Sequence, residues 1–198
     1  MFSYLKSAHN SLWDRCLGVD TAVQTRPSDT SLYRDALKAN AVAYGVIFRY
    51  VRLLRLQPSD VVYDIGCGAG RPLCVFARQN IARCIGIEMD RRLAEIARLN
   101  LVHLARRRCE AAVIQGDAAL ADYKDGSVFW LYNAFGPRTL AAVLERIRQS
   151  VVASPRQVRF CYVTPEAERA FSASTWLTRY KTVRPFLHPS CAASFWRN

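Results

Sequence analysis

Apolar residues at helical spacing alternate along the chain with short runs of β-branched and aromatic residues, beginning near residue 36. Residues 36–56 carry apolar side chains three or four positions apart, which predicts an amphipathic helix. Residues 61–65 form a short apolar run that stops at glycines, which predicts a buried parallel strand. Pro72 suits the first turn of a following helix, which is predicted to end near Asn80.

The same alternation continues toward the C-terminus. Further strands are predicted, in order, at residues 84–88, 112–115, 127–132 and 158–163. Asp90 is a predicted N-cap for the helix after the second strand, and a helix with Leu140, Leu144 and Ile147 on one face follows the fourth. This order predicts an α/β fold with a doubly wound, mostly parallel sheet and helices on both faces.

The last part of the chain differs from that pattern. Residues 175–184 and 192–197 are predicted to be two strands with no helix between them, and therefore a hairpin. The sheet would then have seven strands, with an antiparallel strand at its C-terminal end. Residues 36–198 form one predicted domain, and the less regular residues 1–35 a predicted flap or lid. In that segment Asp29, Thr30 and Tyr33 are candidate acceptor contacts; the alternative is a flap that only covers the sheet.

Composition narrows the class of protein. The chain has 198 residues, 51% hydrophobic and 22% charged, which is typical of one globular domain. No run approaches the ~18 apolar residues of a membrane span, and we expect no signal peptide core. The net charge of +12 fits an anionic partner such as RNA, although a generally basic composition explains it equally well.

The seven cysteines argue against a metal site. None forms a C-x-x-C pair, so zinc-ribbon and thioredoxin-type interpretations fail, and we expect no metal. Their number is odd and several lie in apolar runs, which is typical of buried thiols in a reducing compartment. We therefore expect a cytoplasmic protein.

Unusual residues gather where the predicted strands end. A glycine-rich run from Asp64 to Gly70 closes the first strand, Glu88 closes the second, and residues 116–118 close the third. Ligands of open α/β sheets bind beyond the carboxyl ends of the strands. Glycines let the backbone approach a ligand closely, and a carboxylate such as Glu88 can accept both hydroxyl hydrogens of a ribose. Alternatively, Asp64 only caps the loop and Glu88 is a solvated acid.

The spacing of the glycines distinguishes between the known nucleotide-binding motifs. A dinucleotide fingerprint needs Gly or Ala where this chain has Arg71, and a P-loop needs a lysine that is absent here. The remaining pattern, D-x-G-x-G-x-G with an acid after the second strand, resembles motif I of the class I S-adenosylmethionine-dependent methyltransferases. The resemblance covers about residues 36–198 and implies the Rossmann-like methyltransferase fold with S-adenosylmethionine as cofactor. It implies these cofactor-binding residues: Asp64, Gly66, Cys67, Gly68, Gly70, Glu88, Asp117, Ala118 and Asn133.

The segment after the fourth strand is the predicted acceptor site. In this superfamily it faces the transferred methyl group, and here it runs from Tyr132 to Pro137. The side-chain carbonyl of Asn133 could hold an amine N–H, and Phe135 could wall the site and attract a cation. The segment is similar to one in non-SET histone-lysine methyltransferases, and the chain resembles more fully small bacterial methyltransferases with an Asn-Pro-Phe-Gly loop. The alternative is a plain turn before a helix.

Three functions follow from these patterns. The first is N-methylation of an amine, in a protein lysine or a small molecule, with Asn133 and Phe135 as catalytic residues. The second is an RNA methyltransferase with a basic face. Its candidate residues are Arg71, Arg91, Arg92 and Arg138. The third is a nucleoside-binding scaffold without chemistry. The acceptor, the number of methyl groups and the oligomeric state stay open.

Overall fold

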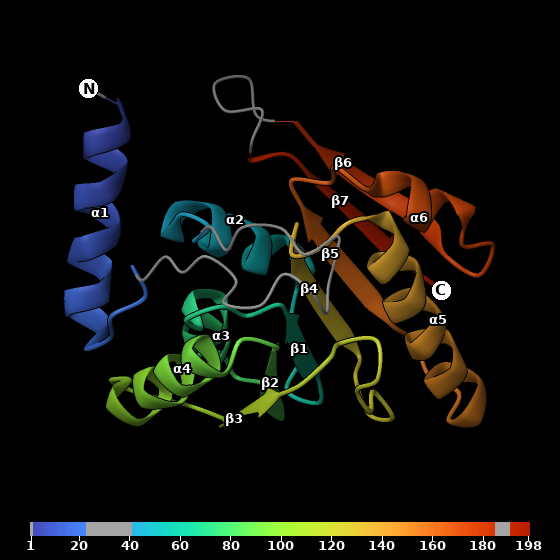
Figure 1. Ribbon diagram of the computed structural model, residues 1–198, viewed down its shortest axis with the longest axis horizontal. Coiled ribbons are helices and arrows are strands. Elements are labelled where there is room, and N and C mark those ends of the chain that lie inside the picture. The colour runs from blue at the N-terminus through green and yellow to red at the C-terminus, as the bar shows by residue number, and fades with distance from the viewer. Residues whose placement is uncertain (1, 23–40, 185–190) are drawn as a thin grey trace.

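The computed structural model describes residues 2–22, 41–184 and 191–198. In this part of the chain seven strands form one sheet, in the order β3-β2-β1-β4-β5-β7-β6 (Figure 1). The strands are β1 Val61–Ile65, β2 Arg83–Glu88, β3 Glu110–Gln115, β4 Val128–Tyr132, β5 Arg159–Val163, β6 Thr178–Val183 and β7 Ala193–Arg197. Strands β1 to β5 pair in parallel, and β7 lies antiparallel to both β5 and β6. The predicted fold class is confirmed.

Helices cover both faces of the sheet. They are α1 Phe2–Leu17, α2 Tyr44–Leu54, α3 Arg71–Phe76, α4 Arg91–His103, α5 Pro137–Ala153 and α6 Glu168–Ala173. One core cluster joins α2, α3 and α4 to the sheet through residues such as Ile47 and Leu73, and a second joins α5 and α6 through Leu140 and Phe171. Figure 1 shows these two groups of helices on opposite sides of the strands. The strand order reverses between β1 and β4, where a ligand site is expected.

Several predicted helix boundaries were wrong. Helix α2 begins at Tyr44, after an extended Ala43, and residues 36–40 lie outside the described residues. Helix α3 ends at Phe76 and not near Asn80. The Ala77 carbonyl accepts the backbone N–H of Arg108 and therefore serves a distant segment instead of a continuing helix. Helix α6 was not predicted, because the apolar positions in its six residues are too few to show a period.

The N-terminal segment is more regular than expected of a flap. Residues 2–17 form the helix α1, and Leu17, only 1% exposed, packs in the core cluster shared with α2 and α3. The segment predicted as a lid continues past residue 22, where Asp29, Thr30 and Tyr33 lie outside the described residues. Among the helices of the described chain, none combines the length and the apolar character needed to span a bilayer.

Candidate cofactor and acceptor site

The glycine-rich loop follows β1 with three glycines in left-handed backbone conformations, at φ 75° for Gly66, 55° for Gly68 and 85° for Gly70. A Cβ at Gly66 would lie 2.3 Å from the Cβ of Ala134, so this glycine lets the loop after β4 pack against the loop after β1. Among the residues that the structure describes, a Cβ at Gly68 would meet no atom within 4 Å. The Gly68 backbone therefore borders open space and could approach a ligand closely.

Asp64 is a buried carboxyl group with an unused oxygen. Its side chain comes from β1, it is 2% exposed, and its Oδ2 atom has no hydrogen-bond partner among the described residues. Burial raises the pKa of Asp64 to about 8, against the lowering effect of the Leu73 backbone N–H, and the Glu88 carboxylate raises it further. Since an isolated buried carboxylate is costly, such a group is suited to a cationic partner.

Glu88 is tied to the glycine-rich loop. Its carboxylate accepts the backbone N–H of Gly68 at 2.8 Å and that of Asp90 at 2.9 Å. Burial raises the pKa of Glu88, and these N–H groups oppose the shift. Glu88 is therefore bonded to the protein and not only to solvent. Each carboxylate oxygen can accept a second hydrogen bond, so the group fits a ribose beside Gly68.

Two of the predicted cofactor residues turn their side chains into the protein. A Cβ on Gly86 would lie 2.7 Å from the Sγ atom of Cys67, which shows that the Cys67 side chain packs against β2. Ala118 is 9% exposed and belongs to the core cluster with α5. Only the backbones of Cys67 and Ala118 remain candidate ligand contacts. Beside Ala118, one carboxylate oxygen of Asp117 accepts the N–H of Ala119 at 2.8 Å and closes a turn.

The loop after β4 holds its polar side chain in place. Asn133 has a left-handed φ of 40°, which is uncommon for a residue other than glycine. The Tyr162 hydroxyl donates to Oδ1 of Asn133 at 3.4 Å and accepts the backbone N–H of Ala167 at 3.1 Å. Phe135 is partly buried against the core cluster of α5 and α6. Gly136 is the N-cap of α5, so the predicted turn and the predicted site occupy the same segment.

The sequence analysis missed a carboxylate, Glu166, that acts electrostatically on Tyr132 and Tyr162. Burial, followed by smaller effects that include the Glu166 carboxylate, raises the pKa of both Tyr132 and Tyr162. Glu166 follows β5, behind Thr164, which has a φ of 51° that is rare for a β-branched residue. No motif contains Glu166. Its position after the carboxyl end of a strand next to β4 is the one signal that could have indicated it.

Arg71 is not part of a basic surface, contrary to one prediction. It is 4% exposed, its Nη2 atom lies 3.6 Å from Oδ2 of Asp14, and its Nε atom donates to Oγ1 of Thr21 at 2.6 Å. Arg91 and Arg92 are exposed at the start of α4, as predicted. Where a dinucleotide fingerprint has Gly or Ala, this chain therefore has a buried arginine that is paired with the N-terminal segment.

A groove of about 290 Å³ lies elsewhere, over β1, β2 and β3. Its apolar floor includes Tyr63, Ile85 and Ala112. None of the predicted site residues lines it, so it is separate from the candidate site. Within the described ranges, no three His, Cys, Asp or Glu side chains gather as they would around a metal ion.

Comparison with known proteins agrees with this geometry. The family model of protein-L-isoaspartate(D-aspartate) O-methyltransferase matches residues 34–126, which include Asp64, Glu88 and Asp117 and stop before Asn133. This match, the strand order and the glycine spacing agree. Together they support a class I S-adenosylmethionine-dependent methyltransferase. The predicted superfamily and cofactor are thereby confirmed, whereas the family match does not reach the acceptor loop.

Two relatives and one solved structure of the same fold are named for different methyl acceptors. A histone-lysine N-methyltransferase specific for H3 lysine-79, from Dictyostelium discoideum, is 27% identical over 114 residues, which are 50% of this chain and 6% of that protein. A protein-lysine N-methyltransferase of Saccharolobus islandicus is 27% identical over 90 residues, 44% of this chain and 54% of that protein. The chain thus spans about half of one relative and a small part of the other. An RNA methyltransferase from Salinibacter ruber, solved with S-adenosyl-L-homocysteine, shares the fold, with TM-score 0.60, 24% identity, and coverage of 80% and 92% of the two chains.

Proposed function

We propose that this methyltransferase transfers a methyl group to the nitrogen of an amine, with Asn133 holding the acceptor. The observation that carries the proposal is the position of the Asn133 loop. Ala134 packs against Gly66, so the acceptor loop adjoins the glycine-rich loop, and Tyr162 holds Oδ1 of Asn133. An amine held there would lie close to a cofactor bound at the ends of β1 and β2.

The residues at these strand ends fit the cofactor. Asp64 offers an unpaired buried carboxylate oxygen for the cationic amino-acid end, and Glu88 offers two acceptor oxygens for the ribose hydroxyls. The open space beside Gly68 leaves room for the nucleoside. When bound, the cofactor supplies an activated methyl group on a sulfonium. The protein then contributes mainly proximity and alignment, which are worth roughly 7–11 kcal/mol in favourable cases.

The acceptor loop favours an amine over other nucleophiles. Oδ1 of Asn133 keeps one lone pair beside the bond from Tyr162 and can accept an amine N–H, which directs the nitrogen lone pair away from the loop. The Glu166 carboxylate is an attractive charge for a cationic amine, as is the partly buried ring of Phe135. Solvent removes the ammonium proton before transfer. The two lysine methyltransferases among its relatives support a protein lysine as acceptor.

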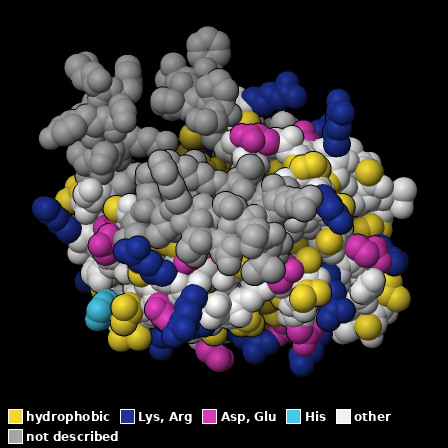
Figure 2. All heavy atoms as spheres, in the orientation of Figure 1, with side chains coloured by type: hydrophobic (Ala, Val, Ile, Leu, Met, Phe, Trp, Pro, Cys, Tyr) yellow, Lys and Arg dark blue, Asp and Glu magenta, His cyan; other side chains and the backbone are white. Residues whose placement is uncertain are grey.

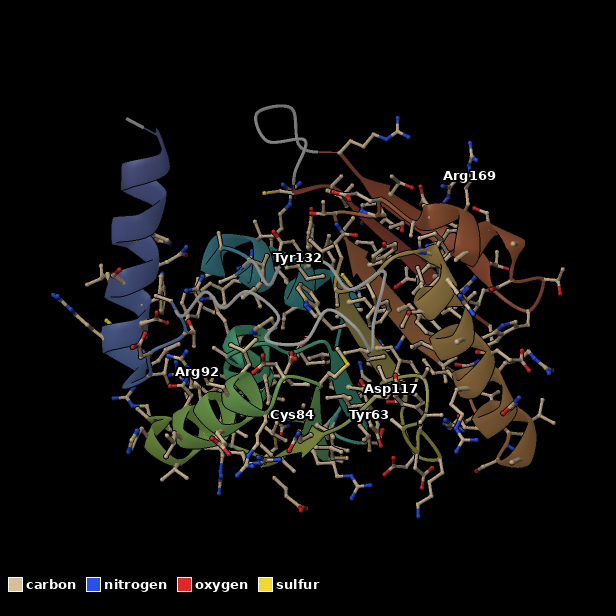
Figure 3. The ribbon with its side chains drawn as sticks, viewed as in Figure 1. Tyr63, Cys84, Arg92, Asp117, Tyr132 and Arg169 are labelled. Carbon is tan, nitrogen blue, oxygen red and sulfur yellow. The ribbon has the colours of Figure 1, made fainter. Side chains whose placement is uncertain are left out.

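RNA is the second candidate acceptor, because the net charge is +12. An RNA site needs its cations gathered on one face. On the face in Figure 2, Lys and Arg side chains are spread around the molecule and mixed with acidic ones. Figure 3 labels Arg92 on α4 and Arg169 on α6, on opposite sides of the sheet. This scatter, with Arg71 buried, favours the amine.

The test is transfer of a radiolabelled methyl group from S-adenosylmethionine to a cell extract, followed by protease or nuclease digestion. We expect label in protein or in a small amine, lost by at least tenfold in Asn133→Ala. Asn80→Ala, an exposed asparagine at the end of the turns after α3, is the matched control and should keep full activity. Label released only by nuclease, or transfer that is unchanged in Asn133→Ala, overturns the proposal. Binding of S-adenosylhomocysteine without any labelled product would favour the hypothesis of a nucleoside-binding scaffold.

A further inference from the structure

Four buried side chains from three separate segments meet at the start of α3. The Asp14 carboxylate accepts the hydroxyls of Thr21 at 2.7 Å and Tyr44 at 2.6 Å, both at Oδ1. The Arg71 guanidinium lies 3.6 Å from Asp14, donates to Thr21 at 2.6 Å, and stacks 5.1 Å from the centre of the Tyr44 ring. A further donation, from Nη1, goes to the carbonyl of Val42 at 3.2 Å. All four residues are at most 6% exposed.

The same N-terminal segment also holds the other side of the glycine-rich loop. The Asn100 amide donates to the carbonyls of Asp20 and Ala69, at 2.8 and 2.9 Å, and its oxygen accepts the Asp20 N–H at 2.8 Å. Ala69 precedes Gly70, and Arg71 follows it. Residues 14–21 are therefore bonded directly to Arg71 and, through Asn100 of α4, to Ala69. These two residues flank Gly70, whose left-handed conformation starts α3.

A purely stabilising role does not account for this arrangement. Removing two charges from water costs several kcal/mol per ion, so a buried ion pair contributes little net stability, and its better attested use is to specify one conformation. Here the fixed conformation is that of the loop between Gly66 and Gly70, which borders the candidate cofactor site. Arg71 itself is buried under Asp14, Thr21 and Tyr44 and does not face that site.

We propose that Arg71 is a positioning residue: through Asp14 and Thr21 it ties the N-terminal segment to the glycine-rich loop and holds the loop in its cofactor-binding conformation. The inference rests on the proposed function, because its test measures binding of S-adenosylhomocysteine. The N-terminal helix α1 then influences cofactor binding through Asp14 without touching the cofactor itself. None of its described residues was predicted to bind the cofactor.

The test compares two Arg→Lys variants. Arg71→Lys removes the bond to Thr21 and keeps the charge. Arg159→Lys is the matched control, because Arg159 donates to the buried Asp60 at 2.6 Å, at the opposite end of the strands. We measure the Kd of S-adenosylhomocysteine by calorimetry, the Tm, and amide hydrogen exchange over residues 66–70. Both substitutions should lower the Tm, since both disturb a buried ion pair.

We expect Arg71→Lys to raise the Kd at least tenfold, or about 1.4 kcal/mol, and to speed exchange in the loop. Arg159→Lys should change the Kd less than twofold. Equal changes in the two variants, or no change in either, overturn the inference. Should Arg71→Lys not fold, Thr21→Val replaces it, with an expected two- to fivefold effect. This substitution removes the hydroxyl that accepts from Arg71 and donates to Asp14, and it keeps the ion pair. If the wild-type protein does not bind S-adenosylhomocysteine, the proposed function fails, and loop exchange alone decides the role of Arg71.

Discussion

Binding of the cofactor should release a proton from Asp64 at neutral pH. Because burial raises the pKa of Asp64 to about 8, roughly nine-tenths of the free protein carries a protonated Asp64 at pH 7. A cationic group bound at its unpaired oxygen favours the ionised form. If only the ionised form binds, apparent affinity follows the ionised fraction. The affinity for S-adenosylhomocysteine should then rise about tenfold from pH 6 to pH 7 and level off above about pH 8.

Calorimetry in two buffers of different ionisation enthalpy measures this release. At pH 7 the wild-type protein should release nearly one proton per bound ligand. Asp64→Asn keeps an acceptor for the Leu73 N–H, but its neutral side chain should bind the ligand weakly and with no proton release. Glu88→Gln is the control that changes the neighbouring acid and leaves Asp64 titratable. Binding heats that do not depend on the buffer in the wild-type protein refute the assignment of Asp64 to the cofactor cation.

Further predictions follow from the same site. Gly68→Ala should weaken binding of S-adenosylhomocysteine at least tenfold with a modest loss of Tm. Gly66→Ala should lower the Tm strongly, because a Cβ at this position would overlap Ala134. Thermal melts and calorimetry on both variants distinguish the two effects. Glu88→Ala should cost about 1–3 kcal/mol of cofactor binding, and unchanged affinity would contradict its ribose contact. Tyr162→Phe should lower kcat several-fold with unchanged cofactor Kd, since Asn133 loses its hydroxyl donor. In the free protein, Tm should fall as the pH rises from about 4 through about 8, because the folded state holds the Asp64 proton more tightly than the unfolded state does. Asp64→Asn should flatten this dependence.

Much of the fold could be predicted because its signals are local. The strands β1 to β5 lie within two residues of their predicted positions, since buried parallel strands are short apolar runs bounded by turns. The Asp90 cap is confirmed by its bond to the Leu93 N–H at 3.0 Å. Helix ends were less predictable. The C-terminal end of α3 depends on a carbonyl that bonds across about thirty residues, and no local pattern contains that information.

The cofactor half of the candidate site could likewise be predicted from the sequence, because a glycine-rich turn and the acid of the next strand keep a similar spacing in nucleotide-binding βαβ units. Asp64, Glu88 and the glycine spacing belong to this class. Folding alone brought Thr21 to Arg71 and Ala134 to Gly66. These partners are separated by tens of residues, and a contact between them exists only once the sheet has placed their strand ends at a common edge. The sequence therefore determines which reactive side chains follow each strand. The tertiary structure decides which of these side chains lie close enough to act on one ligand.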